Sequence, residues 1–135
     1  MCIFCKIIAK QIPSTILYED KDTMAILDIS QVTLGHTLIL TKQHFNDFRD
    51  APAEDLAKCM TVVKNVAKKL EKAFAPEGFN LISNCGEAAG QSVNHLHFHL
   101  IPRYDGNDGL TLTFKASQNP NLDEIILEIN EKNSS

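Results

Sequence analysis

Residues 95–101 of this chain alternate strictly between histidine and apolar residues, and no other segment constrains the fold as strongly. Successive side chains of a β-strand point to opposite faces of the sheet. The run therefore predicts a strand with one apolar face and one face of imidazoles, formed respectively by Leu96, Phe98 and Leu100 and by His95, His97 and His99. The apolar face accounts for packing, so the imidazoles need a separate explanation.

The rest of the chain predicts an α+β domain. Apolar residues recur at helical spacing between Pro52 and Pro76, which indicates one long helix. Apolar and β-branched runs predict the other strands, over residues 16–19, 23–29, 36–42 and 79–83. Predicted strands both precede and follow a single long helix along the chain. This order favours an antiparallel sheet, here with five strands. We expect one domain over residues 1–135, with a tail from about residue 104.

Smaller elements complete the expected fold. Short terminal helices are predicted over residues 3–9 and 122–129. Pro102 is expected to break the last strand, because proline lacks the N–H that a strand donates. Residues 104–109 have the composition of a loop, and residues 131–135 are expected to fray.

Composition and charge narrow the functional class. The chain has 135 residues, 44% hydrophobic and 22% charged, which fits an ordinary globular domain. Its net charge of −4 argues against a nucleic-acid-binding surface, although donors in a pocket can still bind a small anion. The sequence has no apolar stretch long enough for a membrane span and no signal-peptide pattern at its start. We therefore expect a cytoplasmic protein without nucleic-acid or membrane partners.

Three imidazoles in a row favour chemistry at phosphorus or a metal site. A neutral imidazole is a good nucleophile when an acceptor holds the proton on its second nitrogen. Neighbouring imidazoles can then donate to phosphate oxygens as negative charge develops. Zinc coordination uses the same geometry. A polar strand face with incidental histidines is the third interpretation, and three of five histidines in one run count against it.

The N-terminal cysteine pair indicates a metal site. Cys2 and Cys5 have the spacing of zinc ligands, and His44 and His95 would complete a Cys2His2 set. In a reducing compartment such a pair favours metal or redox chemistry over a structural disulfide. The alternative is that Cys2 lies too close to a mobile terminus to bind metal. Two cysteines remain. Cys59 is expected to pack on the apolar face of the long helix, and Cys85 lies in a loop and has no assigned role.

The run over residues 95–101 resembles the signature of the histidine-triad family. Other family landmarks stand in the same order, namely residues 3–8, Asp28-Ile29-Ser30 with Gly35-His36, and Asn84, Gly86 and residues 90–93. The Gln91-Ser92-Val93 loop is similar to the branch of nucleotide-binding phosphoramidases, and less like the branch that cleaves dinucleoside polyphosphates. Thr41 and Cys85 depart from the family pattern.

This resemblance implies roles around the phosphate. His97 would be the nucleophile and form a covalent nucleotidyl-histidine, with His95 and His99 as the other members of the triad. His99, Ser92 and Gln91 would contact the phosphate or the leaving group, and the Ser92 hydroxyl is suited to passing a proton to a departing amine. Ser92 as a plain turn residue is the alternative.

The resemblance also implies how the nucleoside is held. Asp28 would accept hydrogen bonds from the ribose hydroxyls, unless it is only a turn residue. Asn84 would contact phosphate or ribose, or instead hold its own loop. His36 would support the triad, or be a plain structural histidine. Three apolar residues resemble the positions that sandwich the base, with core packing as the alternative: Phe4, Ile7 and Ile26.

The function implied is hydrolysis of the P–N bond of purine nucleoside phosphoramidates. A dinucleoside polyphosphate hydrolase and a zinc-stabilised nucleotide-binding scaffold with little catalysis are the alternatives. The resemblance further implies a structural zinc on Cys2, Cys5, His44 and His95, no redox cofactor, and a homodimer with C-terminal residues near the partner's site.

Overall fold

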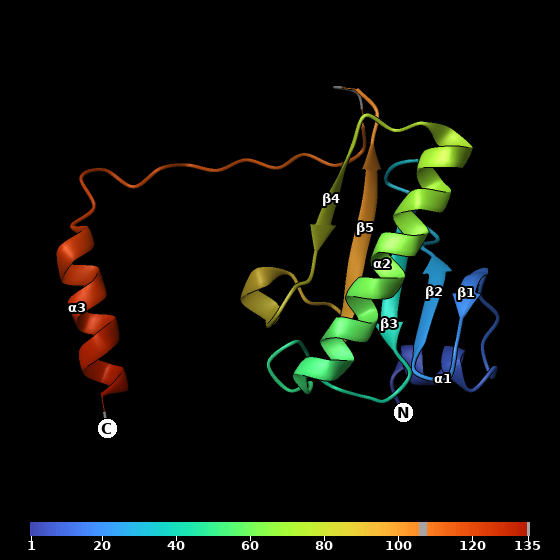
Figure 1. Ribbon diagram of the computed structural model, residues 1–135, viewed down its shortest axis with the longest axis horizontal. Coiled ribbons are helices and arrows are strands. Elements are labelled where there is room, and N and C mark those ends of the chain that lie inside the picture. The colour runs from blue at the N-terminus through green and yellow to red at the C-terminus, as the bar shows by residue number, and fades with distance from the viewer. Residues whose placement is uncertain (106–107, 135) are drawn as a thin grey trace.

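The computed structural model describes residues 1–105 and 108–134 of the chain. Its elements follow in the order α1 (Ile3–Ile8), β1 (Ile16–Glu19), β2 (Thr23–Leu27), β3 (Thr37–Thr41), α2 (Ala53–Phe74), β4 (Gly78–Ile82), a 3-10 turn (Glu87–Ala89), β5 (His97–Arg103) and α3 (Leu122–Asn133). The strands form one sheet in the order β1-β2-β3-β5-β4, in which every neighbouring pair is antiparallel (Figure 1). The predicted α+β fold with a five-stranded antiparallel sheet is confirmed.

The two faces of the sheet carry different layers. Helix α2 crosses one face, where its buried side chains pack on Leu96, Phe98 and Leu100. Helix α1 lies against the other face, where Phe4 and Ile7 pack with residues of β2 and β3. The side chains of β5 therefore alternate between the two faces as the sequence predicted, with the apolar set facing α2.

The limits of α2 follow from its end residues. Glu54 and Asp55 lie in its first turn, where negative charge interacts favourably with the helix dipole. Ala75 has a left-handed conformation with φ 49°, donates to the Glu71 carbonyl, and is followed by Pro76, which cannot continue the helix. Cys59 is fully buried on the α2 face, in the packing role expected for it. Phe74, the last residue of α2, is 41% exposed.

The predicted limits of the last strand are wrong at both ends. The first residue of β5 that pairs with β3 is His97, opposite Leu40, because the His95 N–H donates to Val93 and the Leu96 N–H donates to Phe45. The strand also continues through Pro102 to Arg103, opposite Gly78. Pairing with β3 ends at Leu100, so proline falls where only one neighbouring strand remains.

The C-terminal segment differs from expectation in length and position. Helix α3 runs to Asn133, beyond the predicted end at residue 129 and into the stretch expected to fray. An ion pair between Lys132 and Glu128, with N···O at 2.7 Å, supports this last turn. Figure 1 shows α3 away from the sheet at the end of an extended connection. The expected loop over residues 104–109 lies partly outside the described residues.

None of the described helices is both long and apolar enough to cross a lipid bilayer.

Candidate functional site

His97 lies at the start of β5 with its ring in a fixed orientation. Its Nδ1 lies 2.7 Å from the backbone oxygen of His95. A carbonyl only accepts, so Nδ1 carries the proton and Nε2 keeps its lone pair. No hydrogen bond to Nε2 occurs among the described residues, and the ring lines a cavity. This is the protonation pattern of an imidazole nucleophile.

Burial keeps the central histidines neutral. Desolvation lowers the pKa of His97 and, together with the neighbouring rings of His97 and His36, lowers the pKa of His99 to about 4. Desolvation also lowers the pKa of His36, although the Asp28 carboxylate opposes it. At neutral pH these imidazoles are therefore uncharged.

A chain of polar contacts extends behind His99. The Nε2 atom of His36 lies 2.9 Å from Nδ1 of His99 and 3.7 Å from a carboxylate oxygen of Asp28. The carboxylate favours a proton on Nε2 of His36, which then donates to His99 and leaves the other His99 nitrogen as a donor. Burial alone would raise the pKa of Asp28, but two hydrogen bonds from Ser30 and the nearby His36 lower it, so Asp28 is ionised.

The cavity beside these histidines has a volume of about 480 Å³, and its lining is apolar in one part and polar in another. One part is apolar, formed by Phe4, Ile7, Ile26 and Leu38. The polar lining residues that matter here are Asp28, Ser92, His97 and His99. The Phe4 ring meets the His97 ring edge-on, with centroids 4.9 Å apart. A flat apolar group with a hydroxylated, anionic extension fits this distribution.

The loop over residues 84–92 holds its shape through Gln91. The Gln91 side chain accepts from the Gly86 N–H and donates to the carbonyls of Asn46 and Val93. Gln91 therefore supports the loop and does not line the cavity. Asn84 donates to the Gly90 carbonyl and lines a second, smaller hollow on the far side of His99. Of the three site residues predicted in this loop, Asn84, Gln91 and Ser92, it is Ser92 that lines the main cavity.

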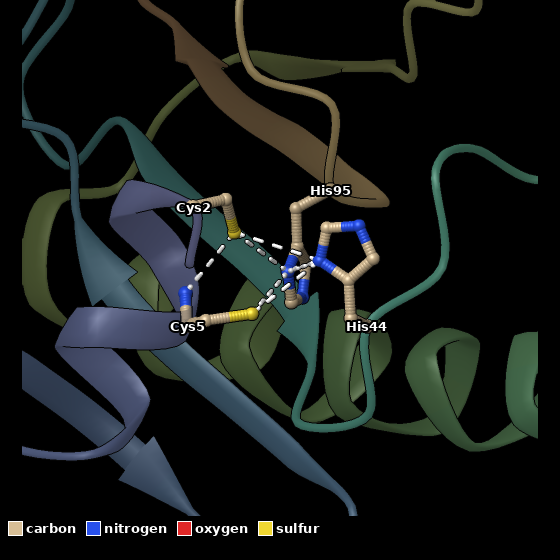
Figure 2. A group of neighbouring side chains, drawn as sticks. All are labelled: Cys2, Cys5, His44 and His95. Carbon is tan, nitrogen blue, oxygen red and sulfur yellow. Dashed lines mark hydrogen bonds between the residues drawn. The ribbon is translucent and has the colours of Figure 1, made fainter.

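Four predicted metal ligands converge beside the start of β5 (Figure 2). The Cys2 sulfur lies 3.4 Å from Nδ1 of His95 and 3.6 Å from Nδ1 of His44. The Cys5 sulfur lies 3.4 Å from Nδ1 of His44 and 3.6 Å from Nδ1 of His95. The two imidazole nitrogens are 3.2 Å apart. The side chain of His95 thus points into this group and not into the cavity.

These separations fit a tetrahedral zinc site. Zn–S bonds of about 2.3 Å and Zn–N bonds of about 2.0–2.1 Å at tetrahedral angles require ligand atoms roughly 3.3–3.8 Å apart. The sulfur–nitrogen separations of 3.4–3.6 Å lie within this range, and the nitrogen–nitrogen separation of 3.2 Å lies just below it. Nε2 of His95 lies 2.6 Å from the Thr41 carbonyl and so carries the proton, which leaves Nδ1 free to coordinate. Asp28, His36 and His99 form a second possible cluster, but the 2.9 Å contact between its two imidazoles is a hydrogen bond.

Some site residues were not predicted. Leu38 lines the cavity and pairs directly with His99 across the β3–β5 ladder, so both side chains lie on one face. Thr41 supplies the carbonyl that orients His95. Leu38 could have been identified from the pairing of β3 with β5, because the side chains of residues 36–42 alternate between the faces in the same way as the histidines. The sequence gives no signal for the Thr41 contact, which uses a backbone atom.

Comparison with known proteins gives close relatives over most of the chain. The HIT domain profile matches residues 9–106. An uncharacterized HIT-like protein of Methanocaldococcus jannaschii is 44% identical over 129 residues, which cover 96% of this chain and 98% of that protein. The adenosine 5′-monophosphoramidase of Saccharomyces cerevisiae is 43% identical over 117 residues, or 87% of this chain and 72% of that protein.

Solved structures agree with these relatives. A HIT family protein from Bacillus anthracis superposes with a TM-score of 0.90 at 44% identity, covering 98% of this chain and 97% of that one. A zinc-bound histidine triad family protein from Mycobacterium smegmatis gives a TM-score of 0.75 at 35% identity, covering 87% and 84%. The family match, the identities and the shared fold lead to one conclusion: this chain belongs to the HIT family.

Proposed function

We propose that this protein hydrolyses the P–N bond of purine nucleoside 5′-phosphoramidates of the AMP type, through a covalent nucleotidyl-histidine on His97. The observation that carries the proposal is the 2.7 Å contact from Nδ1 of His97 to the His95 carbonyl, which leaves the Nε2 lone pair free beside a nucleotide-sized cavity. The name of the yeast relative, adenosine 5′-monophosphoramidase, supports this reaction class.

The lining of the cavity suggests how the substrate is oriented. The purine would lie among Phe4, Ile7, Ile26 and Leu38, where apolar contact favours a flat base. One Asp28 oxygen is already bonded to Ser30, so the other is available to the ribose hydroxyls. The phosphorus would then lie near Nε2 of His97, with His99 donating to a phosphate oxygen. Asn84 and Gln91 would act through the shape of their loop.

The reaction would proceed in two steps. In the first, Nε2 of His97 forms a bond to phosphorus while the P–N bond breaks, and the amine leaves with a proton supplied through the Ser92 hydroxyl. The imidazolium formed is stabilised because its Nδ1–H donates more strongly to the His95 carbonyl. In the second, water attacks phosphorus and returns one proton through Ser92, which restores its hydroxyl, while the bond to His97 breaks and the nucleotide is released. No electrons are transferred, so no redox cofactor is needed.

We propose that Cys2, Cys5, His44 and His95 hold a structural zinc ion. The tetrahedral separations and the zinc-bound Mycobacterium smegmatis relative support this assignment. Four protein ligands leave no open position, so the ion would stabilise structure and would not activate water. Since His95 also provides the carbonyl that orients His97, metal binding would fix the nucleophile indirectly.

The remaining expectations concern partners and location. Purine nucleotides are the proposed ligands, and a second copy of this chain is the proposed protein partner. A cytoplasmic location stays a prediction from the sequence.

The decisive experiment mixes the protein with adenosine 5′-phosphoramidate and measures both AMP release and the intact protein mass. We expect turnover and a transient adenylyl adduct, and we expect His97→Gln to show neither. Full turnover by His97→Gln would rule out this nucleophile. A much faster rate on a dinucleoside polyphosphate would favour that substrate class, and AMP binding without turnover of either substrate would favour a scaffold.

A further inference from the structure

Residues 43–47, here called the ligand segment, follow β3 and carry the candidate metal ligand His44 (Figure 2). His44 and Asn46 are both exposed, so side-chain packing contributes little to holding them in place. The Phe45 carbonyl accepts from the Leu96 N–H at 2.7 Å, which joins the segment to the chain just before β5. Coordination of His44 would add a second point of attachment, so metal binding would restrict the position of this segment.

Asn46 lies between the metal group and the loop over residues 84–92. Nδ1 of His44 faces the two cysteine sulfurs, and its Nε2 lies 3.4 Å from the side-chain oxygen of Asn46. A metal-bound histidine commonly donates its second N–H to an oxygen in this way. The backbone carbonyl of Asn46 accepts from the Gln91 side chain at 2.6 Å. Asn46 therefore connects the metal ligand to Gln91.

Gln91 in turn holds the backbone on both sides of Ser92. Its amide nitrogen also donates to the Val93 carbonyl, 3.1 Å away, so it bridges the two neighbours of Ser92. Its amide oxygen accepts from the Gly86 N–H at 2.8 Å, in an earlier part of the same loop. No hydrogen bond to the Ser92 hydroxyl occurs among the described residues. The backbone that Gln91 holds therefore determines where this hydroxyl lies.

We propose that Gln91 is a positioning residue, which couples occupancy of the metal group to the position of Ser92. The path leads from His44 through Asn46 to the Gln91 amide. It is separate from the contact through which the His95 carbonyl orients the nucleophile. The role of Ser92 as proton donor rests on the proposed function, whereas the coupling between the metal group and the loop does not.

Coupling between two sites is reciprocal, which separates this role from a plain structural one. If zinc restricts the loop through Gln91, then a loop without this contact must bind zinc more weakly by the same factor. A path of hydrogen bonds is expected to give a factor of about ten. A residue that shaped only its own loop would change the motion of the loop and leave the zinc affinity as it is.

The test compares amide hydrogen exchange in the zinc-loaded protein and in the same protein after chelation. In the wild type, the Gly86 and Gln91 amides bond within the loop, and their exchange should become about tenfold faster without zinc. The amides of α2 serve as the reference for global unfolding. Gln91→Met should show fast exchange at both loop positions with or without zinc. Competition with a chromogenic chelator should show that it binds zinc about tenfold more weakly.

Two further variants make the test specific. Gln91→Glu keeps an oxygen that can accept from Gly86 but has no N–H for Asn46, so its loop should also lose the response to zinc. Glu87→Gln is the matched control, because Glu87 lies in the same loop with an exposed side chain. It should change neither the loop exchange nor the zinc affinity more than about twofold.

A second measurement asks whether Ser92 is the group that Gln91 positions. Gln91→Met should slow release of an alkylamine from AMP about tenfold or more, because the amine leaves with a proton. Release of p-nitrophenolate from its AMP ester needs no such proton and should change less than about twofold. Equal slowing of both reactions would overturn the link to Ser92. Absence of turnover with either compound would count against the proposed function alone, because exchange and zinc affinity are measured without substrate.

Three results would overturn the coupling itself. Loop exchange in the wild type that is the same with and without zinc would show that the metal group and the loop are independent. A loop that still responds to zinc in Gln91→Met or Gln91→Glu would show that the path does not pass through the Gln91 amide. An unchanged zinc affinity in Gln91→Met would show that Gln91 shapes only its own loop.

Discussion

The two faces of the sheet are built from the same strands, yet their burial has different consequences. On the α2 face, β5 contributes Phe98 and Leu100, which pack among apolar side chains. On the α1 face the same strand contributes His97 and His99, and His97 is only 5% exposed. Apolar groups need only fill space when buried, whereas buried polar groups need hydrogen-bond partners.

That requirement fixes proton positions on the α1 face. The backbone carbonyl of His95 determines which nitrogen of His97 carries the proton, and the Thr41 carbonyl does the same for His95. Burial also keeps these rings neutral, since desolvation lowers the pKa of both. The α2 face thus contributes stability, whereas on the α1 face the hydrogen bonds that burial requires fix the tautomers of the histidines.

The largest expected effect tests this division with two adjacent residues of β5. His97→Gln should lower the phosphoramidase rate by roughly 10³-fold or more, because a nucleophile is lost, while the free energy of unfolding changes by about 1 kcal/mol. Phe98→Ala should do the reverse, lowering the free energy of unfolding by about 3–5 kcal/mol through the cavity it leaves. Rates per folded molecule and urea unfolding give the two quantities.

If Phe98→Ala reduced the rate of its folded fraction as severely as His97→Gln, the separation between the faces would be wrong.

The next effect concerns the metal. We expect about one zinc per chain by elemental analysis, and removal by a chelator should destabilise the fold by several kcal/mol, because binding energy contributes to folding. Cys5→Ser should abolish stoichiometric zinc. Cys85→Ser is the matched control, a loop thiol outside the ligand group, and should keep it. Zinc retained by Cys5→Ser, or a melting temperature indifferent to the chelator, would contradict the assignment.

Much of this organisation could be predicted because it is local in the sequence. The alternation in β5 and the helical spacing in α2 each report one face of one element, and each was confirmed by the packing. The Cys2–Cys5 spacing predicted half of the metal group. The two histidines of this group could also be named from the sequence. They meet because the chain that follows β3 lies beside the start of β5, which the sequence does not show.

The failures concern properties that sequence patterns do not contain. The start of β5 depends on the N–H groups of His95 and Leu96 bonding elsewhere, which periodicity cannot show. The three backbone contacts of the Gln91 side chain, which is predicted to contact the phosphate, are a second feature that no sequence pattern contains. The position of α3 away from the sheet could not be predicted either, because an amphipathic sequence does not specify which surface its apolar side meets.

An intermediate effect arises from the pKa of His99, about 4 in the fold against a usual value near 6.5. Because the folded state disfavours the proton, its contribution to stability is complete above about pH 6.5 and is lost as pH falls toward 4. The full loss is about 3 kcal/mol at the conversion of 1.36 kcal/mol per pKa unit. Urea unfolding between pH 7 and 4 should therefore show a shallower pH dependence for His99→Asn than for the wild type. Parallel curves would show that His99 is not the titrating group.

The smallest effect tests whether the polar lining of the α1 face recognises ribose. Asp28→Asn should weaken AMP binding about tenfold, because charged hydrogen bonds to hydroxyls are stronger than neutral ones. The matched ligand is 2′,3′-dideoxy-AMP, which lacks the hydroxyls and should bind the variant and the wild type equally in calorimetric titrations. A tenfold loss for both ligands would mean that the substitution disturbs Ser30 or His36, which contact the same carboxylate. A loss confined to AMP would instead assign the free oxygen of Asp28 to the sugar, and it would show that this face selects its ligand by hydrogen bonding as well as by shape.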